Sequence, residues 1–235
     1  MKTNQLNRRG FTLVELLVVI VIIASLAGLT APMVIRQRKK ADQTEAVNNA
    51  RQIGLAMLEF ETEYGSFPDS DTLEELDETF TSPDVQGEAG SDSNGYFKQL
   101  FQAGITQSEE MFYVKTPYSK KPDGDIDGDE ALTDGEVGFG YIMDGDSGMS
   151  IAGNPARALV ATPLNEDGGD FDGDPFDKKA VILRMDNSVT SVNIRVSSGD
   201  DSNEGPAILG GEELLDSSNP IWGGDDPQMQ APVVK

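Results

Sequence analysis

Acidic residues near the middle of the chain have the spacing of a calcium-binding loop. Asp123, Asp125 and Asp127 alternate with other residues, Gly128 follows, and Asp134 is the twelfth residue counted from Asp123. In such loops alternate carboxylates converge on Ca²⁺ because the glycine turns the chain sharply. Asp134 stands where a longer Glu is usual, and no EF-hand helices are expected around the loop. We therefore predict a calcium-binding loop outside an EF-hand, with a solvated acidic turn as the alternative.

A second acidic cluster lies nearer the C-terminus and lacks the twelve-residue pattern. Its carboxylates could complete a cation site between two loops, or they could form a polar turn before a hairpin. We favour the turn. The members of the cluster are Asp167, Asp170, Asp172, Asp174 and Asp177.

The composition argues against enzymatic chemistry, because the chain contains neither histidine nor cysteine. Ser-His-Asp and Cys-His catalysis and His-ligated zinc therefore cannot be built within it. The segment Gly145-Asp146-Ser147-Gly148 resembles the nucleophile segment of trypsin-like proteases, but the general base is missing. Glycoside hydrolysis uses a pair of carboxylates, but among 41 Asp and Glu residues the presence of such pairs does not indicate this activity. We expect no enzyme, and a domain that folds without disulfides.

Charge is sharply segregated along the chain. There are 18 Lys and Arg against 41 Asp and Glu, a net charge of −23. Residues 1–40 hold seven of the basic residues and one acid, so residues 41–235 hold 11 basic and 40 acidic residues, a net charge of −29. This part would repel nucleic acid, whose binding depends on cationic neutralisation of phosphates. A high-salt habitat is an alternative reason for its acidity.

One stretch is long and apolar enough to cross a membrane. Leu16 to Ile35 are twenty residues without a charge, and a helix of that length spans roughly 30 Å, the thickness of a bilayer hydrocarbon core. Glu15 stands at the head of this run, where burial of a charge in lipid costs on the order of 3 kcal/mol or more. Such a carboxylate needs a partner.

The residues around this glutamate form a motif. A short basic leader ends in a glycine, a phenylalanine follows, and the glutamate is the fifth residue after the glycine. The chain resembles the type IV pilin and type II secretion pseudopilin class over residues 8 to about 68. The motif residues are Lys2, Arg8, Arg9, Gly10, Phe11 and Glu15, and Pro32 stands where many pilins have a helix-kinking proline.

The resemblance implies a processing and assembly pathway. A prepilin peptidase would cut between Gly10 and Phe11 and methylate the new Phe11 amine. Glu15 would then pair with the Phe11 amine of a neighbouring pilin-like subunit in a homo- or hetero-polymer. It further implies a bacterial inner-membrane protein that crosses once, with a cytoplasmic N-terminus and a C-terminal domain in the periplasm or in an extracellular filament. Major pseudopilins also hold calcium in a loop of the globular domain, which does not identify ligands here.

Three other readings of the N-terminus are open. An ordinary secretory signal could be cleaved at Ser25-Leu26-Ala27, although Glu15 at the edge of the apolar core argues against it. Arg8 and Arg9 followed by apolar residues also mimic a twin-arginine export signal. The third is a plain membrane anchor with an accidental Glu15. Basic residues flank both ends of the run, so counting charges does not decide the orientation.

Residues 11 to about 64 are expected to form one helix, which Gly28 and Pro32 interrupt weakly and Pro32 kinks. Beyond residue 40, apolar residues recur at steps of three and four, so one face of this half should pack on a sheet of the same chain. That face comprises Val47, Ala50, Ile53, Met57, Phe60 and Tyr64. A glycine and a proline in Tyr64-Gly65-Ser66-Phe67-Pro68 end the helix.

The remainder is expected to complete an α+β fold. Thr72-Leu73-Glu74-Glu75 matches a capping box and predicts a short helix over 73–80, followed by a loop and a second short helix over 96–103. Strands are predicted over 137–143, 158–162, 179–184 and 189–196, the last two joined by a tight turn at Asp186-Asn187-Ser188. A long helix followed by strands indicates an antiparallel sheet packed on that helix, and the resemblance implies the lollipop fold of pilins. The predicted parts are a leader (1–10), a transmembrane segment (11–35), the exposed half of the helix (36–64), a globular domain (65–196) and a partly mobile acidic tail (197–235).

Two functions follow from these patterns. The first is a structural subunit of a type IV pilus-like or type II secretion pseudopilus filament. The second is a membrane-tethered, calcium-dependent adhesin or binding module that never polymerises. Glu15 distinguishes them, because polymerisation uses its charge and tethering does not.

Overall fold

The computed structural model describes residues 11–79, 92–126, 130–194 and 214–235. The chain divides into two compact units, the first ending at Arg38 and the second comprising Lys39–Lys235. The predicted leader, most of the predicted loop over 81–95 and the first part of the predicted tail lie outside the described residues.

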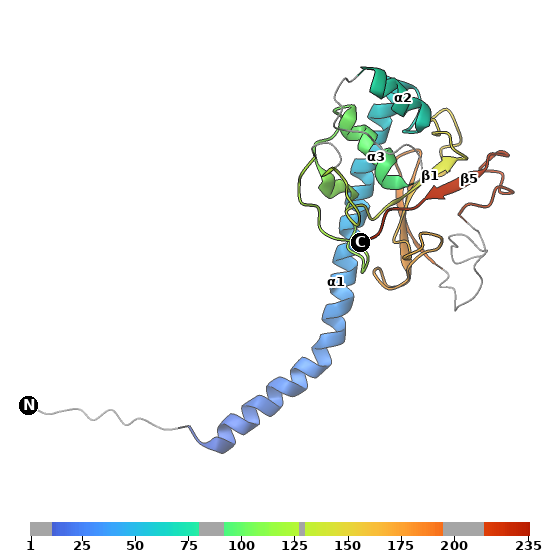
Figure 1. Cartoon of the computed structure of the whole chain (residues 1–235). Coiled ribbons are helices and arrows are strands. Elements are labelled where there is room, and N and C mark those ends of the chain that lie inside the picture. The colour runs from blue at the N-terminus through green and yellow to red at the C-terminus, as the bar shows by residue number, and fades with distance from the viewer. Residues whose placement is uncertain (1–10, 80–91, 127–129, 195–213) are drawn as a thin grey trace, which may run out of the picture. The chain divides into compact units, whose positions relative to one another are not determined.

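Helix α1 (Leu13–Tyr64) contributes to both units and carries Pro32 inside it (Figure 1). In the second unit one face of α1 is buried at steps of three and four, which confirms the predicted apolar face. The helix ends where predicted, and Gly65 follows with a φ of +85°, a left-handed conformation that glycine adopts without a steric penalty. The buried residues are Ala46, Asn49, Ala50, Ile53, Gly54, Ala56, Met57, Phe60 and Glu61.

Helix α2 (Ser70–Thr79) begins three residues before the predicted start. The cause is the capping residue, which is Asp69 and not Thr72. Asp69 Oδ1 accepts from Thr72 N at 2.8 Å, and Thr72 Oγ1 accepts in return from Asp69 N at 2.9 Å. Each side chain thus satisfies a backbone donor that the first turn of the helix leaves unpaired.

Helix α3 (Ser93–Gln102) also begins three residues earlier than predicted, so 93–95 are helical and not part of a loop. Asp92 is its N-cap, and the Asp92 side chain accepts from Gly95 N at 2.9 Å. A short 3₁₀ helix, η1 (Glu109–Phe112), follows.

The sheet has five strands in the order β4-β3-β2-β1-β5, all pairs antiparallel. Strands β2 and β3 have the predicted bounds, and β1 begins three residues after the predicted start. The sequence prediction contains no counterpart of β5, which pairs with β1 at the opposite edge from β4. The strands are β1 (Gly140–Asp144), β2 (Ala158–Thr162), β3 (Lys179–Arg184), β4 (Val189–Asn193) and β5 (Pro227–Gln230).

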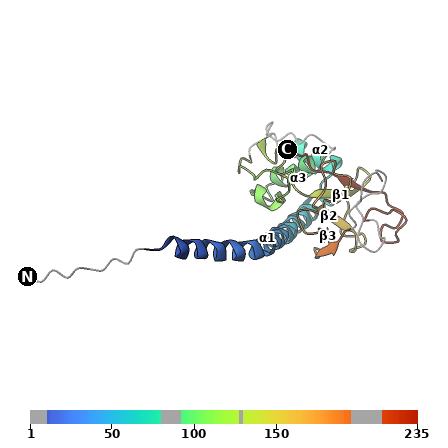
Figure 2. The ribbon, with the colours of Figure 1, turned by 90° about the horizontal axis from the view of Figure 1, so that it is seen from below.

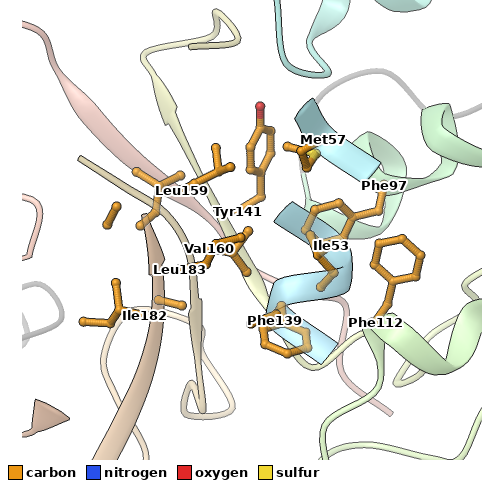
Figure 3. Packing of buried hydrophobic residues seen from close by; sticks show 14 of the residues in the cluster. Ile53, Met57, Phe97, Phe112, Phe139, Tyr141, Leu159, Val160, Ile182 and Leu183 are labelled. Atoms are coloured by element: carbon orange, nitrogen blue, oxygen red, sulfur yellow. The ribbon is translucent and has the colours of Figure 1, made fainter. Parts of the chain in front are cut away.

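The core of the second unit lies on both sides of α1. Figure 3 shows Ile53 and Met57 of α1 with the sheet residue Tyr141 on one side and the aromatic rings of Phe97 and Phe112 on the other. Figure 2, a view from below, shows the same order of sheet, α1 and short helices. This half of α1 is therefore the central layer of the second unit. The α+β class and the packing of the sheet on α1 were predicted, whereas the short helices on the other side of α1 were not predicted to form a layer. Tyr141 is fully buried, and its hydroxyl donates to Pro68 O at 3.0 Å, which satisfies its polar atom.

Candidate functional sites

The first candidate site is the start of α1. Glu15 Oε2 accepts from Thr12 N at 2.9 Å and from Thr12 Oγ1 at 2.7 Å, and Glu15 N donates to Thr12 Oγ1 at 3.3 Å. Thr12 and Glu15 therefore form a capping box, in which two side chains satisfy backbone donors of the first turn. The pattern Thr-x-x-Glu before an apolar run predicts a capping box from sequence alone. It was not among the predictions made from the sequence. Within one chain, Glu15 thus has a local partner.

The other residues of the predicted processing and assembly site are placed only in part. Gly10 lies outside the described residues, and Phe11 is 80% exposed just before the helix. Pro32 is helical. Ser25 Oγ donates to Val21 O at 2.8 Å, so this segment is continuous helix at the alternative signal cleavage position.

No other part of the first unit covers the apolar run of α1. Every residue from Phe11 to Arg38 is exposed, and the most apolar eighteen-residue window has a mean hydropathy of 2.6. By length and composition α1 can cross a membrane. A helix that is apolar all round requires a covering that these residues do not supply.

The second candidate site is a cluster of three carboxylates, which we call the acidic trio: Glu109, Asp123 and Glu136. One oxygen of each lies within 4.8 Å of the others. Glu109 is 2% exposed and Glu136 is fully buried, whereas Asp123 is exposed. Burial of two carboxylates beside a third is costly unless hydrogen bonds or a cation compensate their charge.

Backbone donors and one lysine supply part of that compensation. Glu109 accepts from Gly124 N at 2.9 Å and from Leu132 N at 2.8 Å. Glu136 accepts from Thr133 N at 2.7 Å and lies 3.7 Å from Lys120 Nζ. Net negative charge remains, because the trio has three carboxylates and this single ion pair among the described residues.

Burial raises the pKa of Glu109. The neighbouring charges of Glu136 and Asp123 raise this pKa further, and the two backbone hydrogen bonds oppose the rise. Carboxylate oxygens are among the ligands that Ca²⁺ prefers, and a cation would also offset the mutual repulsion of these three groups. The chemistry of the trio therefore fits the cation that the pseudopilin resemblance implies.

The structure brings only part of the predicted ligand set together. Asp123 joins the trio, whereas Asp125 and Asp134 do not belong to it and are exposed. Asp127 lies outside the described residues. Glu109 and Glu136 had not been predicted. The Thr133-x-x-Glu136 pattern was a possible signal for one of them, but nothing in the local sequence marks Glu109.

The second acidic cluster consists of turns in the residues that the structure describes. Asp172 Oδ1 accepts from Asp174 N at 2.9 Å, and Asp170 Oδ1 accepts from Phe171 N at 2.7 Å. None of its members belongs to a group of acids close enough to share a cation within those ranges. These contacts favour the turn interpretation.

The protease-like segment is also a turn. Asp144 and Ser147 form an isolated antiparallel bridge, and Gly148 N donates to Asp69 Oδ2 at 2.9 Å. A Cβ at Gly148 would overlap the carbonyl oxygen of Phe67, so the glycine allows this close approach.

Comparison with known proteins adds to this geometry. A family model described as the prokaryotic N-terminal methylation motif matches residues 5–31. The type II secretion system core protein G of Escherichia coli (strain K12) is 36% identical over 95 residues, 40% of this chain and 64% of the relative. The protein of that name from Klebsiella pneumoniae is 30% identical over 97 residues, 41% of this chain and 68% of the relative.

A longer match extends into the globular unit. The type II secretion system core protein G of Dickeya chrysanthemi is 29% identical over 155 residues, 63% of this chain and 98% of the relative. The chain spans less than two thirds of the Escherichia coli relative's length. No solved structure matches the chain.

Proposed function

The chain belongs to the family of the type II secretion system core protein G, and we propose that it is a structural subunit of a type II secretion pseudopilus. The observation that carries the proposal is Glu15, a carboxylate at the head of an apolar helical run that the chain leaves exposed. A filament of such helices would cover the run, and the amine of a neighbouring subunit would compensate the charge. No observation favours the adhesin alternative.

The proposed maturation begins with cleavage between Gly10 and Phe11 by a prepilin peptidase, followed by methylation of the Phe11 amine. The match of residues 5–31 to the methylation motif supports this step. Before assembly, the run from Leu16 to Ile35 would hold the subunit in the bacterial inner membrane as a single span. The N-terminus would be cytoplasmic and the globular unit would lie outside. The partners are the peptidase and other pilin-like subunits.

The capping box suggests a sharper test than removing Glu15 altogether. Glu15→Leu removes both the charge and the cap, so its effect has two explanations. Glu15→Gln keeps an oxygen acceptor for Thr12 but removes the charge, and Thr12→Ala keeps the charge but removes the hydroxyl of the cap. Full-length variants would be scored for cross-linked filament incorporation in cells that carry the secretion system, with membrane extraction as the control for insertion.

We expect Glu15→Leu and Glu15→Gln to insert but to lose at least about tenfold in incorporation, a change of about 1.4 kcal/mol in assembly. Thr12→Ala should incorporate within about twofold of the wild type, because an exposed cap contributes only about 1 kcal/mol to the helix. Normal incorporation of Glu15→Gln would contradict the assembly role and leave Glu15 as a capping residue alone.

We also propose that the second unit binds Ca²⁺ through the acidic trio. Bound calcium would supply positive charge to buried carboxylates that repel one another, and would thereby stabilise the segments that carry them. The support is the donor set of Glu109, Asp123 and Glu136 and the burial of two of its members. The loop ligands Asp125, Asp127 and Asp134 are the competing set.

Calorimetric titration of the full chain in detergent with Ca²⁺ shows whether the acidic trio or the loop ligands bind the ion. Glu109→Gln and Glu136→Gln should abolish uptake if the trio binds, whereas Asp134→Asn should not. Glu110→Gln is the matched control, because Glu110 is the exposed neighbour of Glu109 and pairs only at 3.7 Å with Lys121. Loss of uptake in Asp134→Asn alone would favour the loop, and no uptake by the wild type would remove the calcium proposal.

A further inference from the structure

Four basic residues follow the apolar run of α1 within five positions, and we call them the cationic collar: Arg36, Arg38, Lys39 and Lys40. They all lie on the continuous helix α1, with Gln37 between the two arginines. Arg36, Arg38 and Lys40 are exposed. Lys39 is half-buried, and its ammonium donates to the carbonyl oxygen of Asp174.

Within the second unit, Lys39 and Lys40 form no ion pair among the described residues, although residues 41–235 carry a net charge of −29. The collar's nearest acid along the chain, Asp42, lies 3.3 Å from the ammonium of Lys115 and is thus already paired. The ion pairs of the described ranges are Lys115–Asp42, Lys120–Glu136, Lys121–Glu110 and Arg157–Asp225. Unpaired cations in so acidic a protein indicate an anionic partner outside the chain.

The arrangement of the cations around the helix restricts the partner. At 3.6 residues per turn, Lys39 and Lys40 lie about 60° and 40° to either side of Arg36, whereas Arg38 lies about 160° from Arg36, on the opposite side of the helix. The cations therefore lie on two opposite sides of the helix, three on one side and Arg38 on the other. A protein surface that docks from one side would meet only part of them, whereas a layer of lipid headgroups meets them all.

The position along the helix points to the same partner. The collar begins directly after Ile35, the last residue of the twenty-residue uncharged run, at the depth where a spanning helix enters the headgroup region. We propose that the collar binds the phosphates of anionic phospholipids around the proposed membrane span. This inference rests on the proposed span and goes beyond filament assembly, because it names a lipid partner of the unassembled subunit.

Spin-labelled lipids test the proposal on the full chain. The protein would be reconstituted in phosphatidylcholine vesicles with a trace of spin-labelled phosphatidylglycerol or phosphatidylcholine, and the motionally restricted fraction of each label gives their relative association constants. Each basic residue near an anionic membrane surface contributes about a fivefold gain. We expect at least about a fivefold preference for phosphatidylglycerol at low salt, lost at high salt because of screening.

A triple variant assigns the preference to the collar. Arg36→Gln, Arg38→Gln and Lys40→Gln together should abolish it, whereas the matched control Lys121→Gln, Lys178→Gln and Lys179→Gln removes three exposed charges elsewhere and should retain it. Equal association of the two lipids with the wild type would overturn the proposal, as would a preference that survives in the triple variant. If the collar instead binds the acidic surface of a second copy, the triple variant would lower self-association in pure phosphatidylcholine without any lipid preference.

These outcomes are distinguishable from failure of the proposed function. A wild type that incorporates into filaments but shows no lipid preference overturns the collar and leaves the filament subunit standing. A chain that alkaline carbonate extracts from vesicles contradicts the span, and with it both proposals.

Discussion

The two halves of α1 differ in what covers them. From Leu13 to Arg38 the helix is exposed throughout, and from Leu16 to Ile35 it carries no charge on any side. From Lys39 to Tyr64 one face of the same helix is buried in the core, and the opposite face is mostly polar apart from Leu55. The first half therefore needs a lipid or a neighbouring subunit, and the second half needs only its own chain. Helical periodicity distinguishes the two, because an amphipathic face predicts a core and an unbroken apolar surface predicts an external partner.

The strongest test of this difference between the two halves is to make the same substitution in each. Ile53 is fully buried in the second half, and Ile23 is 59% exposed in the first. Ile53→Ala should lower the free energy of unfolding of the second unit by about 2–5 kcal/mol, because it leaves a cavity in the core. Ile23→Ala should leave that stability unchanged. Trp222, the only tryptophan, is buried in the second unit, so its fluorescence during denaturation of the full chain in detergent reports that unit alone.

Equal effects of the two substitutions would contradict the division of α1. They would mean that residues around Ile23 are part of the cooperative core.

A pair of glycines gives the next largest effect. A Cβ on Gly54 would overlap Asn187 Oδ1 and would lie 3.0 Å from Leu183 Cδ1, whereas a Cβ on Gly28 meets no atom within 4 Å. Gly54→Ala should destabilise the second unit by about 1–3 kcal/mol through overpacking. Gly28→Ala should not affect that unit. Adding Asn187→Gly should restore part of the loss, since Asn187 has a φ of 59° that glycine adopts freely.

A Gly54→Ala variant as stable as the wild type would show that the β3–β4 turn moves away from α1 without cost. The close approach of the turn to the helix would then not contribute to the specificity of the packing.

A smaller loss of stability is expected from a substitution of Arg157, which binds the C-terminal segment of the second unit. Arg157 Nε donates to Ile221 O at 3.0 Å, Arg157 Nη2 lies 2.5 Å from Asp225 Oδ2, and the guanidinium lies 5.7 Å from the ring centre of Trp222. Arg157→Ala should cost about 1–3 kcal/mol and loosen this segment before the sheet unfolds. A red shift of the Trp222 emission and faster acrylamide quenching would measure the loosening. Unchanged emission would show that core packing alone retains Trp222.

The smallest effect is a pH dependence of the second unit in the absence of Ca²⁺. Because burial raises the pKa of Glu109 in the folded state, the folded protein binds this proton more readily than the unfolded chain does. Stability should therefore fall as the pH rises from the unfolded pKa through the raised folded pKa, by on the order of 1 kcal/mol for each unit by which the pKa is raised. Subtracting the profile of Glu109→Gln isolates this contribution, and a difference that is flat with pH would contradict it.

Elements with a local signal were predictable from the sequence. The bounds of β2 and β3, the tight turn after β3 and the buried face of α1 depend on periodicity and turn residues within one segment. The short helices were predicted with late starts, because Asp69 and Asp92 cap them in place of the expected residues.

Elements that depend on distant contacts were not predictable. Strand β5 has the short polar sequence Pro227-Gln228-Met229-Gln230, and it is a strand because it pairs with β1. Glu109 reaches the acidic trio from η1, a separate segment from the loop that carries Asp123. The spacing of acids within one loop therefore pointed to Asp123 but could not identify its neighbours in space.

Mass spectrometry of the N-terminal peptide of the membrane-extracted protein tests the central claim most directly. A subunit matured by the prepilin pathway begins at Phe11 with a methylated amine, and this is the result we expect. A chain that begins at Gly28, or that retains Met1, would mean another export route or a simple anchor, and would contradict the assignment to a filament.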